Sequence, residues 1–179
     1  MAGTGDLPAA DAASRFARIY DAYMPRIYRY IGYHVPDAGT AEDLTSVVFE
    51  KALVAFPRYR DDLSAPQTWL TAIARNVVTD HLRRCGRDQS LPIEAAESVA
   101  CPLPAPGEQV EKKDQLARLH YCLGTLDARH REIVSLKFGA ELTNRRIAET
   151  LRFSETNVGT LLFRALRKLR ECLKGWFDE

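Results

Sequence analysis

A proline-rich segment near the middle of the chain most constrains how these 179 residues can fold. Residues 86–107 begin and end with glycine, contain four prolines and show no sustained hydrophobic periodicity. Proline keeps a chain extended and lacks the backbone N–H that helices and sheets use. We therefore expect a linker over residues 86–107 that separates a first domain, residues 13–85, from a second, residues 108–179.

Apolar side chains in the first domain recur at intervals of three and four residues, the spacing of one buried helix face. Residues 16–34 show this pattern, and Thr40, followed by acidic residues, predicts the N-cap of a second helix that ends at Pro57. Pro66 suits the first turn of a third helix that runs to about Arg84. The first domain is therefore expected to contain three helices.

The second domain continues the helical pattern. Helices are expected from about Glu108 to Leu123 and from Asp127 to Gly139. No segment of the sequence shows the alternation that is typical of strands. The expected fold class is therefore all-α, with two small helical domains joined by a flexible linker.

Composition and charge exclude several classes of protein. No stretch approaches the roughly 18 apolar residues of a membrane span, and residues 1–11 lack the basic start and apolar core of a signal peptide. We expect a soluble, cytoplasmic protein without membrane insertion. The 25 basic and 24 acidic residues nearly cancel, but residues 145–174 hold 8 basic against 3 acidic residues, so any polyanion should bind near the C-terminus.

The four cysteines show no CxxC pair and no histidine at metal-ligand spacing. A structural zinc site is therefore not expected, and reduced thiols are the default interpretation. Cys85 lies among arginines that favour a thiolate, but an incidental thiol at a basic helix end is the better interpretation. We expect neither a metal nor a cofactor.

Residues 144–163 have the length of a helix-turn-helix motif. Ala148 is small enough to let a second helix cross closely, and Ser154 is a suitable N-cap for that helix. Hydroxyl, aromatic and guanidinium groups lie on its polar face: Thr156, Thr160, Phe163, Arg164 and Arg167. Such groups suit the major groove of DNA, where short side chains reach base edges and arginine holds phosphate.

The opposite face of this helix is apolar, with Val158, Leu161, Leu162, Ala165, Leu166 and Leu169 in a narrow arc. An ordinary amphipathic helix with solvated charges is the alternative to a DNA-reading helix. Arg152 stands where the turn usually has glycine, so it would have to accept a strained or altered backbone.

The third helix of the first domain has a second, unusual face. Leu70, Ala74 and Val77 suit a core. A histidine beside them, His81, is more often a hydrogen-bonded core residue than an active group. The other face carries Trp69, Ile73, Asn76, Asp80 and Arg83. A ring, an amide and a guanidinium in line fit a surface that stacks unpaired bases and holds phosphate, although a buried tryptophan is the simpler alternative.

Three segments in the right order resemble bacterial sigma factors of the extracytoplasmic-function type. Residues 42–52 resemble region 2.2 of these proteins, residues 66–84 resemble regions 2.3 and 2.4, and residues 126–173 resemble region 4. The similarity covers about residues 13–173. Three motifs separated by a linker make it specific.

The resemblance implies roles for particular residues. Asp43, Phe49 and Glu50 would dock on the clamp helices of the largest RNA polymerase subunit, and the flap would be a second contact on core polymerase. The positions near the promoter −10 element are Trp69, Asn76, Asp80 and Arg83, together with Arg58 and Arg60 from the loop that would enclose a flipped base. The positions that would read −35 are Glu155, Thr156, Gly159, Thr160, Phe163, Arg164 and Arg167.

The resemblance also implies an anti-sigma factor as a partner, and binding to both double- and single-stranded promoter DNA. The sequence departs from the family pattern at Ser46, Arg146 and Arg152, where glutamine, glutamate and glycine are usual, and these departures bear on promoter sequence and core binding. A helix-turn-helix repressor or activator is the nearest rival, but it gives the Trp69 helix no role. An enzyme is disfavoured, because no Gly-rich phosphate loop, metal-spaced cluster or GxSxG motif is present.

Overall fold

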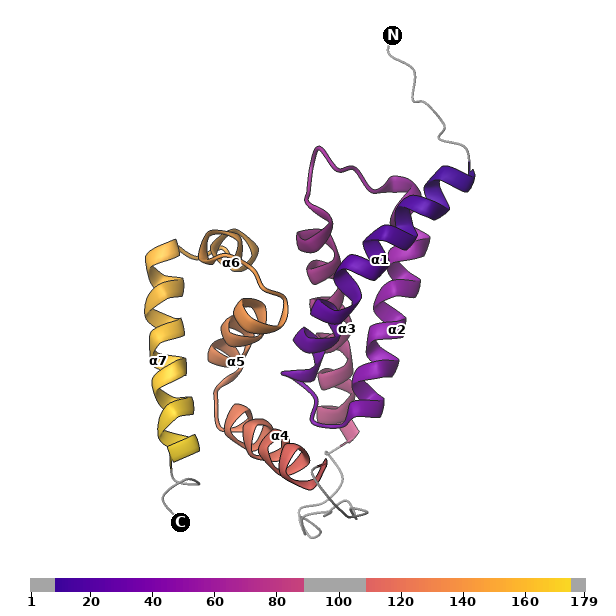
Figure 1. Cartoon of the computed structure of the whole chain (residues 1–179). Coiled ribbons are helices and arrows are strands. Elements are labelled where there is room, and N and C mark those ends of the chain that lie inside the picture. The colour runs from indigo at the N-terminus through magenta and orange to yellow at the C-terminus, as the bar shows by residue number, and fades with distance from the viewer. Residues whose placement is uncertain (1–8, 89–108, 175–179) are drawn as a thin grey trace.

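The computed structural model describes residues 9–88 and 109–174, and every regular element within these ranges is helical. The first half contains α1 (Ala9–Gly32), α2 (Ala38–Ala55), the 3-10 turn η1 (Phe56–Arg58) and α3 (Pro66–Asp88). The second half contains α4 (Gln109–Gly124), α5 (Ala128–Val134), the π-helical turn η2 (Ser135–Gly139), α6 (Asn144–Leu151) and α7 (Glu155–Lys174). The all-α expectation is confirmed (Figure 1).

Helices α1, α2 and α3 pack around a core of fully buried side chains such as Tyr30, Val48 and Leu70. The N-cap of α2 is Asp37, whose carboxylate accepts from the backbone N–H of Thr40 at 2.6 Å. The expected Thr40 cap was therefore wrong by three residues, because an Asp before the helix satisfies the free N–H groups of its first turn. This hydrogen bond also lowers the pKa of Asp37.

Helices α5, α6 and α7 each begin at a short polar cap. The Asp127 carboxylate accepts from the backbone N–H of His130 at 3.0 Å at the start of α5, which lowers the pKa of Asp127 to about 2. The Thr143 hydroxyl accepts from Arg146 N–H at the start of α6. Ser154 accepts from the backbone N–H of Asn157 at 3.2 Å before α7, so the predicted Ser154 cap is confirmed.

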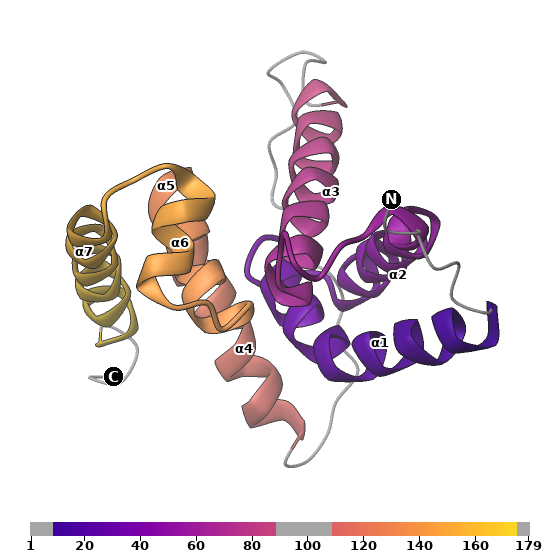
Figure 2. The ribbon, with the colours of Figure 1, turned by 90° about the horizontal axis from the view of Figure 1, so that it is seen from above.

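The two halves pack against each other through one continuous apolar cluster that includes α1, α3, η2 and α6. At the closest approach, a Cβ added to Gly139 would lie 2.6 Å from Cα of Tyr30, so a side chain at position 139 would collide with the α1 backbone. Figures 1 and 2 both show α5 and α6 between α1–α3 and α7, which lies on the outside. The sequence predicts two helical domains but does not reveal this packing.

The linker expected over 86–107 lies mostly outside the described residues. Its first three residues belong to α3, which continues to Asp88 instead of ending near Arg84. Among the helices of residues 9–88 and 109–174, none is long and apolar enough to cross a membrane.

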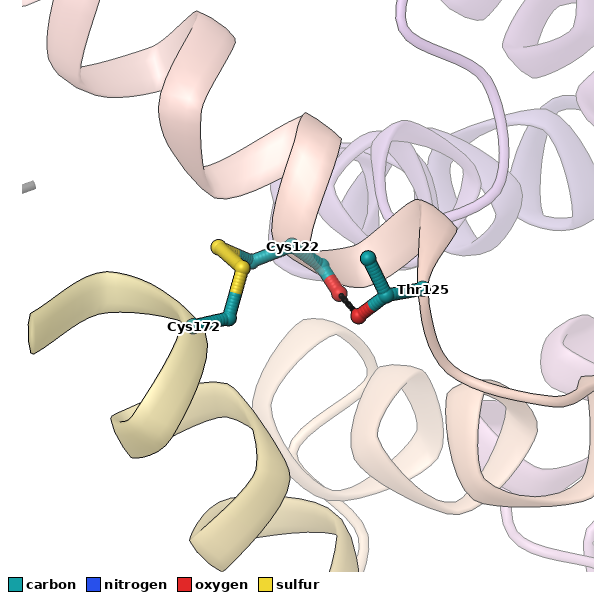
Figure 3. The surroundings of a disulfide bond; sticks show 3 residues. All are labelled: Cys122, Thr125 and Cys172. Carbon is teal, nitrogen blue, oxygen red and sulfur yellow. Dashed lines mark hydrogen bonds between the residues drawn. A yellow bond between two sulfur atoms is a disulfide. The ribbon is translucent and has the colours of Figure 1, made fainter. Parts of the chain in front are cut away.

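A disulfide joins Cys122 near the end of α4 to Cys172 near the end of α7 (Figure 3). The expectation of reduced thiols is therefore wrong for this pair. Fifty residues separate the two cysteines in the sequence, and the packing of α4 on α7 brings their Cα atoms to 5.8 Å. Cys85 is a free, exposed thiol, and Cys101 lies outside the described residues.

Candidate nucleic-acid and polymerase interfaces

Helix α7 presents the polar face that the sequence predicts. Its inner side buries Val158, Leu161 and Ala165, and α7 packs against α4, α5 and α6. The residues left exposed on it include Glu155, Thr156, Thr160, Phe163, Arg164 and Arg167, and Gly159 is half-buried. The large ring of Phe163 is 67% exposed. The expected apolar face included Leu166, and this was wrong, because Leu166 is exposed.

Gly159 lies on this face without a packing reason to be glycine, since a Cβ added there would meet nothing within 4 Å. A glycine on an exposed recognition face lets another backbone approach closely. The predicted −35 residues therefore form one accessible surface on α7.

The turn between α6 and α7 accommodates Arg152 in the left-handed conformation, at φ 57° and ψ 45°. The altered backbone expected at Arg152 is thus confirmed. A non-glycine residue in this conformation costs about 1 kcal/mol. The backbone N–H groups of Arg152 and Phe153 both donate to the carbonyl of Ala148, which closes the end of α6. Arg146, the other departure in this motif, forms an exposed ion pair with Glu149 at 3.0 Å.

Helix α3 exposes Asn76, Asp80 and Arg83 on the face away from its buried residues. Asp80 and Arg83 lie one turn apart, with 3.9 Å between a carboxylate oxygen and a guanidinium nitrogen. Trp69 is half-buried and packs against the core. The alternative interpretation, in which Trp69 is a buried core residue, is therefore partly correct.

One face of the Trp69 ring is covered by Tyr59, with 4.4 Å between ring centroids and an angle of 25°. Tyr59 in turn stacks on Phe56, so three rings extend from the core to the loop at residues 58–65. The Tyr59 hydroxyl donates to the carbonyl of Ser64 at 2.7 Å and closes this loop. Burial, helped by Asp61, raises the pKa of Tyr59 to about 12.

Sequence reasoning missed Tyr59, although an aromatic residue between Arg58 and Arg60 is a recognisable signal. Both arginines are exposed on the loop, where Arg60 forms an ion pair with Asp62 at 2.7 Å. Arg15 of α1 forms an ion pair with Asp61 and so ties the loop to the first helix. The predicted −10 residues therefore lie around one aromatic-lined loop and the adjacent α3 face.

Helix α2 exposes Asp43 and Glu50, seven residues apart on one side. Phe49 does not share this surface. Its side chain is 5% exposed and meets the Tyr20 ring edge-on at 4.6 Å, so its expected contact with a partner is wrong for this conformation. Leu53 and Val54 extend the exposed side instead, at 55% and 82%.

Two family profiles match the two halves of the chain. The family profile described as Sigma-70 region 2 matches residues 19–88, and the profile described as Sigma-70, region 4 matches residues 122–171. The ECF RNA polymerase sigma factor BldN of Streptomyces coelicolor is 34% identical over 171 residues, which are 92% of this chain and 62% of BldN. The chain belongs to the ECF sigma factors.

Further relatives agree with this assignment. The chain is 29% identical to the ECF RNA polymerase sigma factor SigM of Bacillus subtilis over 85% of its own length and 91% of SigM. The fold is similar to that of the sigma factor RpoE of Bartonella quintana in complex with the anti-sigma factor NepR, with a TM-score of 0.67 at 19% identity and coverage of 90% and 98% of the two chains. It is also similar to CnrH in complex with the cytosolic domain of CnrY, with a TM-score of 0.60 at 22% identity and coverage of 93% and 95%.

In this sigma factor, region 2 (α1–α3) and region 4 (α4–α7) meet at a polar cluster inside the interdomain interface. Glu132 of α5 accepts from Arg75 at 2.7 Å and from the Tyr30 hydroxyl at 3.2 Å, and lies 3.4 Å from Nε2 of His34. The glutamate side chain is 19% exposed and that of His34 is 6% exposed. The charge of Glu132 is thus balanced across the interface, as a largely buried carboxylate requires.

His34 titrates abnormally in this cluster. Burial, with a smaller effect of the guanidinium groups of Arg131 and Arg75, lowers its pKa to about 4. His34 is therefore neutral near pH 7, and its Nε2 lies 2.9 Å from the Ser135 hydroxyl.

Two further polar contacts hold the sigma factor in this arrangement. Glu141, which has a positive φ of 57° after η2, forms ion pairs with Arg26 and Arg29 of α1. The Gln67 side-chain amide of α3 donates to the carbonyl of Ala140 at 2.6 Å. Within the described parts of the chain, no group of three or more histidine, cysteine or acidic side chains is placed to hold a metal ion.

Proposed function

We propose that this chain is a dissociable, non-enzymatic sigma subunit that binds core RNA polymerase and directs it to specific promoters in the cytoplasm. The observation that carries the proposal is the presence of two separate exposed surfaces, on α7 and around α3, within matched region 4 and region 2 folds. No cofactor is needed, because strand opening draws on binding energy and breaks no covalent bond.

The α7 surface reads the −35 element. A helix that leaves the body of the protein exposed on one side fits the major groove of B-DNA. Thr156 and Thr160 in its first turns reach base edges, and Arg164 and Arg167 contact phosphates farther along.

The surface around α3 opens the −10 element. A base that leaves the stack must regain a few kcal/mol, and one aromatic or pocket contact supplies about 1 to 3 kcal/mol. The exposed amide of Asn76 donates and accepts on a base edge, and the loop closed by Tyr59 encloses the extruded base. Arg58 and Arg83 hold the neighbouring phosphates.

The exposed side of α2 docks on the clamp helices of core polymerase, and region 4 contacts the flap. Asp43 and Glu50 supply charge, and Leu53 and Val54 supply apolar surface within one stripe. An apolar centre beside charged groups is the usual composition of a protein interface.

The packed arrangement of the two regions is an inactive conformation. The −10 and −35 promoter elements are named by their positions, which lie about 25 base pairs apart. This is roughly 85 Å of B-DNA at 3.4 Å per base pair. A compact chain of 179 residues has a radius of gyration of only about 16 Å. Region 2 and region 4 must therefore separate at the interdomain interface before both promoter elements are bound.

An anti-sigma factor is the partner that controls this opening. Both solved structures described above are complexes of sigma factors with such partners, RpoE with NepR and CnrH with CnrY. In this chain a largely apolar cavity of about 170 Å³ lies between the two regions, lined by residues such as Tyr28 and Val35 of region 2 and Leu116 and Leu119 of α4. An apolar segment of the partner fits this cavity.

Run-off transcription with purified core polymerase tests the proposal. Core polymerase plus this chain should produce a defined transcript from a promoter selected from a library, whereas core alone should not. A helix-turn-helix repressor would bind its site without core and produce no transcript. That result would support the rival class and contradict the sigma assignment.

A further inference from the structure

We propose that Cys122 and Cys172 form a redox-active dithiol site that sets the stability of region 4 and, through it, retention of the −35 element. The inference rests on the proposed function, because a sigma factor works beside the chromosome, where thiols are kept reduced. Disulfides in that compartment are usually transient and redox-sensing. The pair is therefore better explained as a switch than as a permanent structural bond.

The position of the pair suits exchange with a thiol reagent. Cys122 is fully buried on the inner side of α4, whereas Cys172 on α7 is half-buried (Figure 3). A thiolate must reach one sulfur in line to open a disulfide. Cys172 is the sulfur that a reductant reaches, and Cys122 is the leaving group.

The bond strengthens a small apolar cluster. The buried members of that cluster are Cys122, Leu123, Leu126, Val134, Ala165 and Leu169. Arg131 donates to the carbonyls of Leu123 and Gly124 and holds the C-terminal end of α4 independently of the cysteines. Reduction therefore loosens the contact between α4 and the C-terminal half of α7 without releasing α4 altogether.

The bond does not touch the DNA-reading surface. Cys172 follows Thr160 by twelve residues on the same helix, which is roughly 18 Å at 1.5 Å per residue. Reduction therefore acts on promoter binding through the stability of α7, and the bases that α7 prefers stay the same.

The exchange requires a partner thiol couple. On oxidation, the two cysteine thiols lose two protons and two electrons to the disulfide of a small thiol or of a dithiol protein, which becomes two thiols. On reduction, the thiolate of that partner attacks Cys172, and the Cys122 sulfur leaves as a thiolate and takes a proton. A second partner thiol then resolves the mixed disulfide and frees Cys172.

The test uses the full chain and a Cys85→Ser/Cys101→Ser variant in which only the pair remains. Samples are equilibrated in glutathione buffers from oxidising to cytoplasm-like reducing ratios. They are then quenched with acid and alkylated, and mass spectrometry counts the free thiols from the mass added. We expect the pair to pass from disulfide to two thiols across this range. Closing a loop of this length should raise the melting temperature by roughly 10 °C or more, so reduction should lower it by that amount.

Promoter retention by the reconstituted holoenzyme, measured between the two melting temperatures, should fall on reduction. Cys122→Ala/Cys172→Ala should behave like the reduced chain in every buffer. If this variant folds poorly, the wild type, reduced and then reoxidised, provides the same comparison. A pair that stays oxidised or stays reduced throughout, or equal melting in both states, would overturn the inference. Loss of core binding in both states would instead contradict the proposed function, because the clamp-helix contact is made by α2, which the disulfide does not join.

Discussion

At the scale of single residues, Thr160 and Arg164 lie one turn apart on the same exposed face of α7 but have different chemistry. A threonine hydroxyl is short and distinguishes base edges, whereas an arginine on phosphate contributes charge without sequence information. Neither side chain is needed by the buried side of α7, so both are suited to substitution without loss of fold.

Arg164→Ala should weaken binding to all −35 sequences about equally and reduce the salt dependence by roughly one unit of slope. Thr160→Ala should instead change the preferred sequence. Titrating holoenzyme against a panel of −35 variants at several salt concentrations measures both effects. The assignment of roles is wrong if Arg164→Ala changes preference while the salt slope stays constant.

At the scale of elements, α2 separates a buried side from a docking side. Asp43→Lys/Glu50→Lys reverses two exposed charges on the docking side, and surface changes of this kind alter folding stability by less than about 0.5 kcal/mol. We expect the double variant to fold normally and to lose co-purification with core polymerase. Glu42→Lys, an exposed acidic residue next to Asp43 in the sequence, is a suitable control. Normal co-purification of the folded double variant would exclude this face of α2 as the docking surface.

The sequence predicts the elements well because caps, prolines and periodicity are local signals. The helix-turn-helix, the Ser154 cap and the unusual backbone at Arg152 all follow from neighbouring residues. Faces were less predictable on α2, where apolar residues occur on several sides. The resemblance placed Phe49 on the docking surface, whereas the structure buries it and exposes Leu53 and Val54. Periodicity alone cannot separate a core leucine or valine from one on a docking surface.

Features that join distant parts of the chain were not predictable from the sequence. The Cys122–Cys172 bond, the close approach of Gly139 to Tyr30 and the pairing of Glu132 with Arg75 each depend on how separate helices pack. The spacing of two cysteines does not reveal their pairing. The contacts of Gly139 and Glu132 hold the two regions together, whereas the disulfide lies within region 4.

At the scale of the whole molecule, Gly139 is the residue that most directly permits the closed arrangement. Gly139→Ala places a Cβ against the backbone of Tyr30, a form of overpacking that costs about 1–3 kcal/mol. We expect the radius of gyration from small-angle scattering to increase. Gly32→Ala on α1 is the matched control, because a Cβ there meets nothing within 4 Å. An unchanged radius for Gly139→Ala would show that the interface tolerates the methyl group.

The closed arrangement should also depend on pH through His34. Its pKa is about 4 when the interface is closed, compared with 6.5 for a free histidine, so protons bind more readily when it is exposed. Stability of the interface should therefore fall as pH decreases from about 6.5 to 4, by at most about 3 kcal/mol. His34→Gln is the control for this pH dependence. It keeps the other charged and titratable groups that face the ring, namely Arg75, Arg131, Glu132 and Tyr30.

Scattering measured from pH 7.5 to 4.5 checks this prediction. The wild type should expand as the solution is acidified, and His34→Gln should show a much smaller change. Equal expansion of both proteins would assign the pH dependence to other groups.

Permanganate footprinting of a cognate promoter tests the account most directly, because permanganate oxidises unpaired thymines. The −10 thymines should react only when both core polymerase and this chain are present. Asn76→Ala should reduce that reactivity while a closed complex still forms. If the chain occupied the promoter without core polymerase, and the −10 thymines stayed unreactive in its presence, the protein would be an ordinary DNA-binding regulator and the central claim would be wrong.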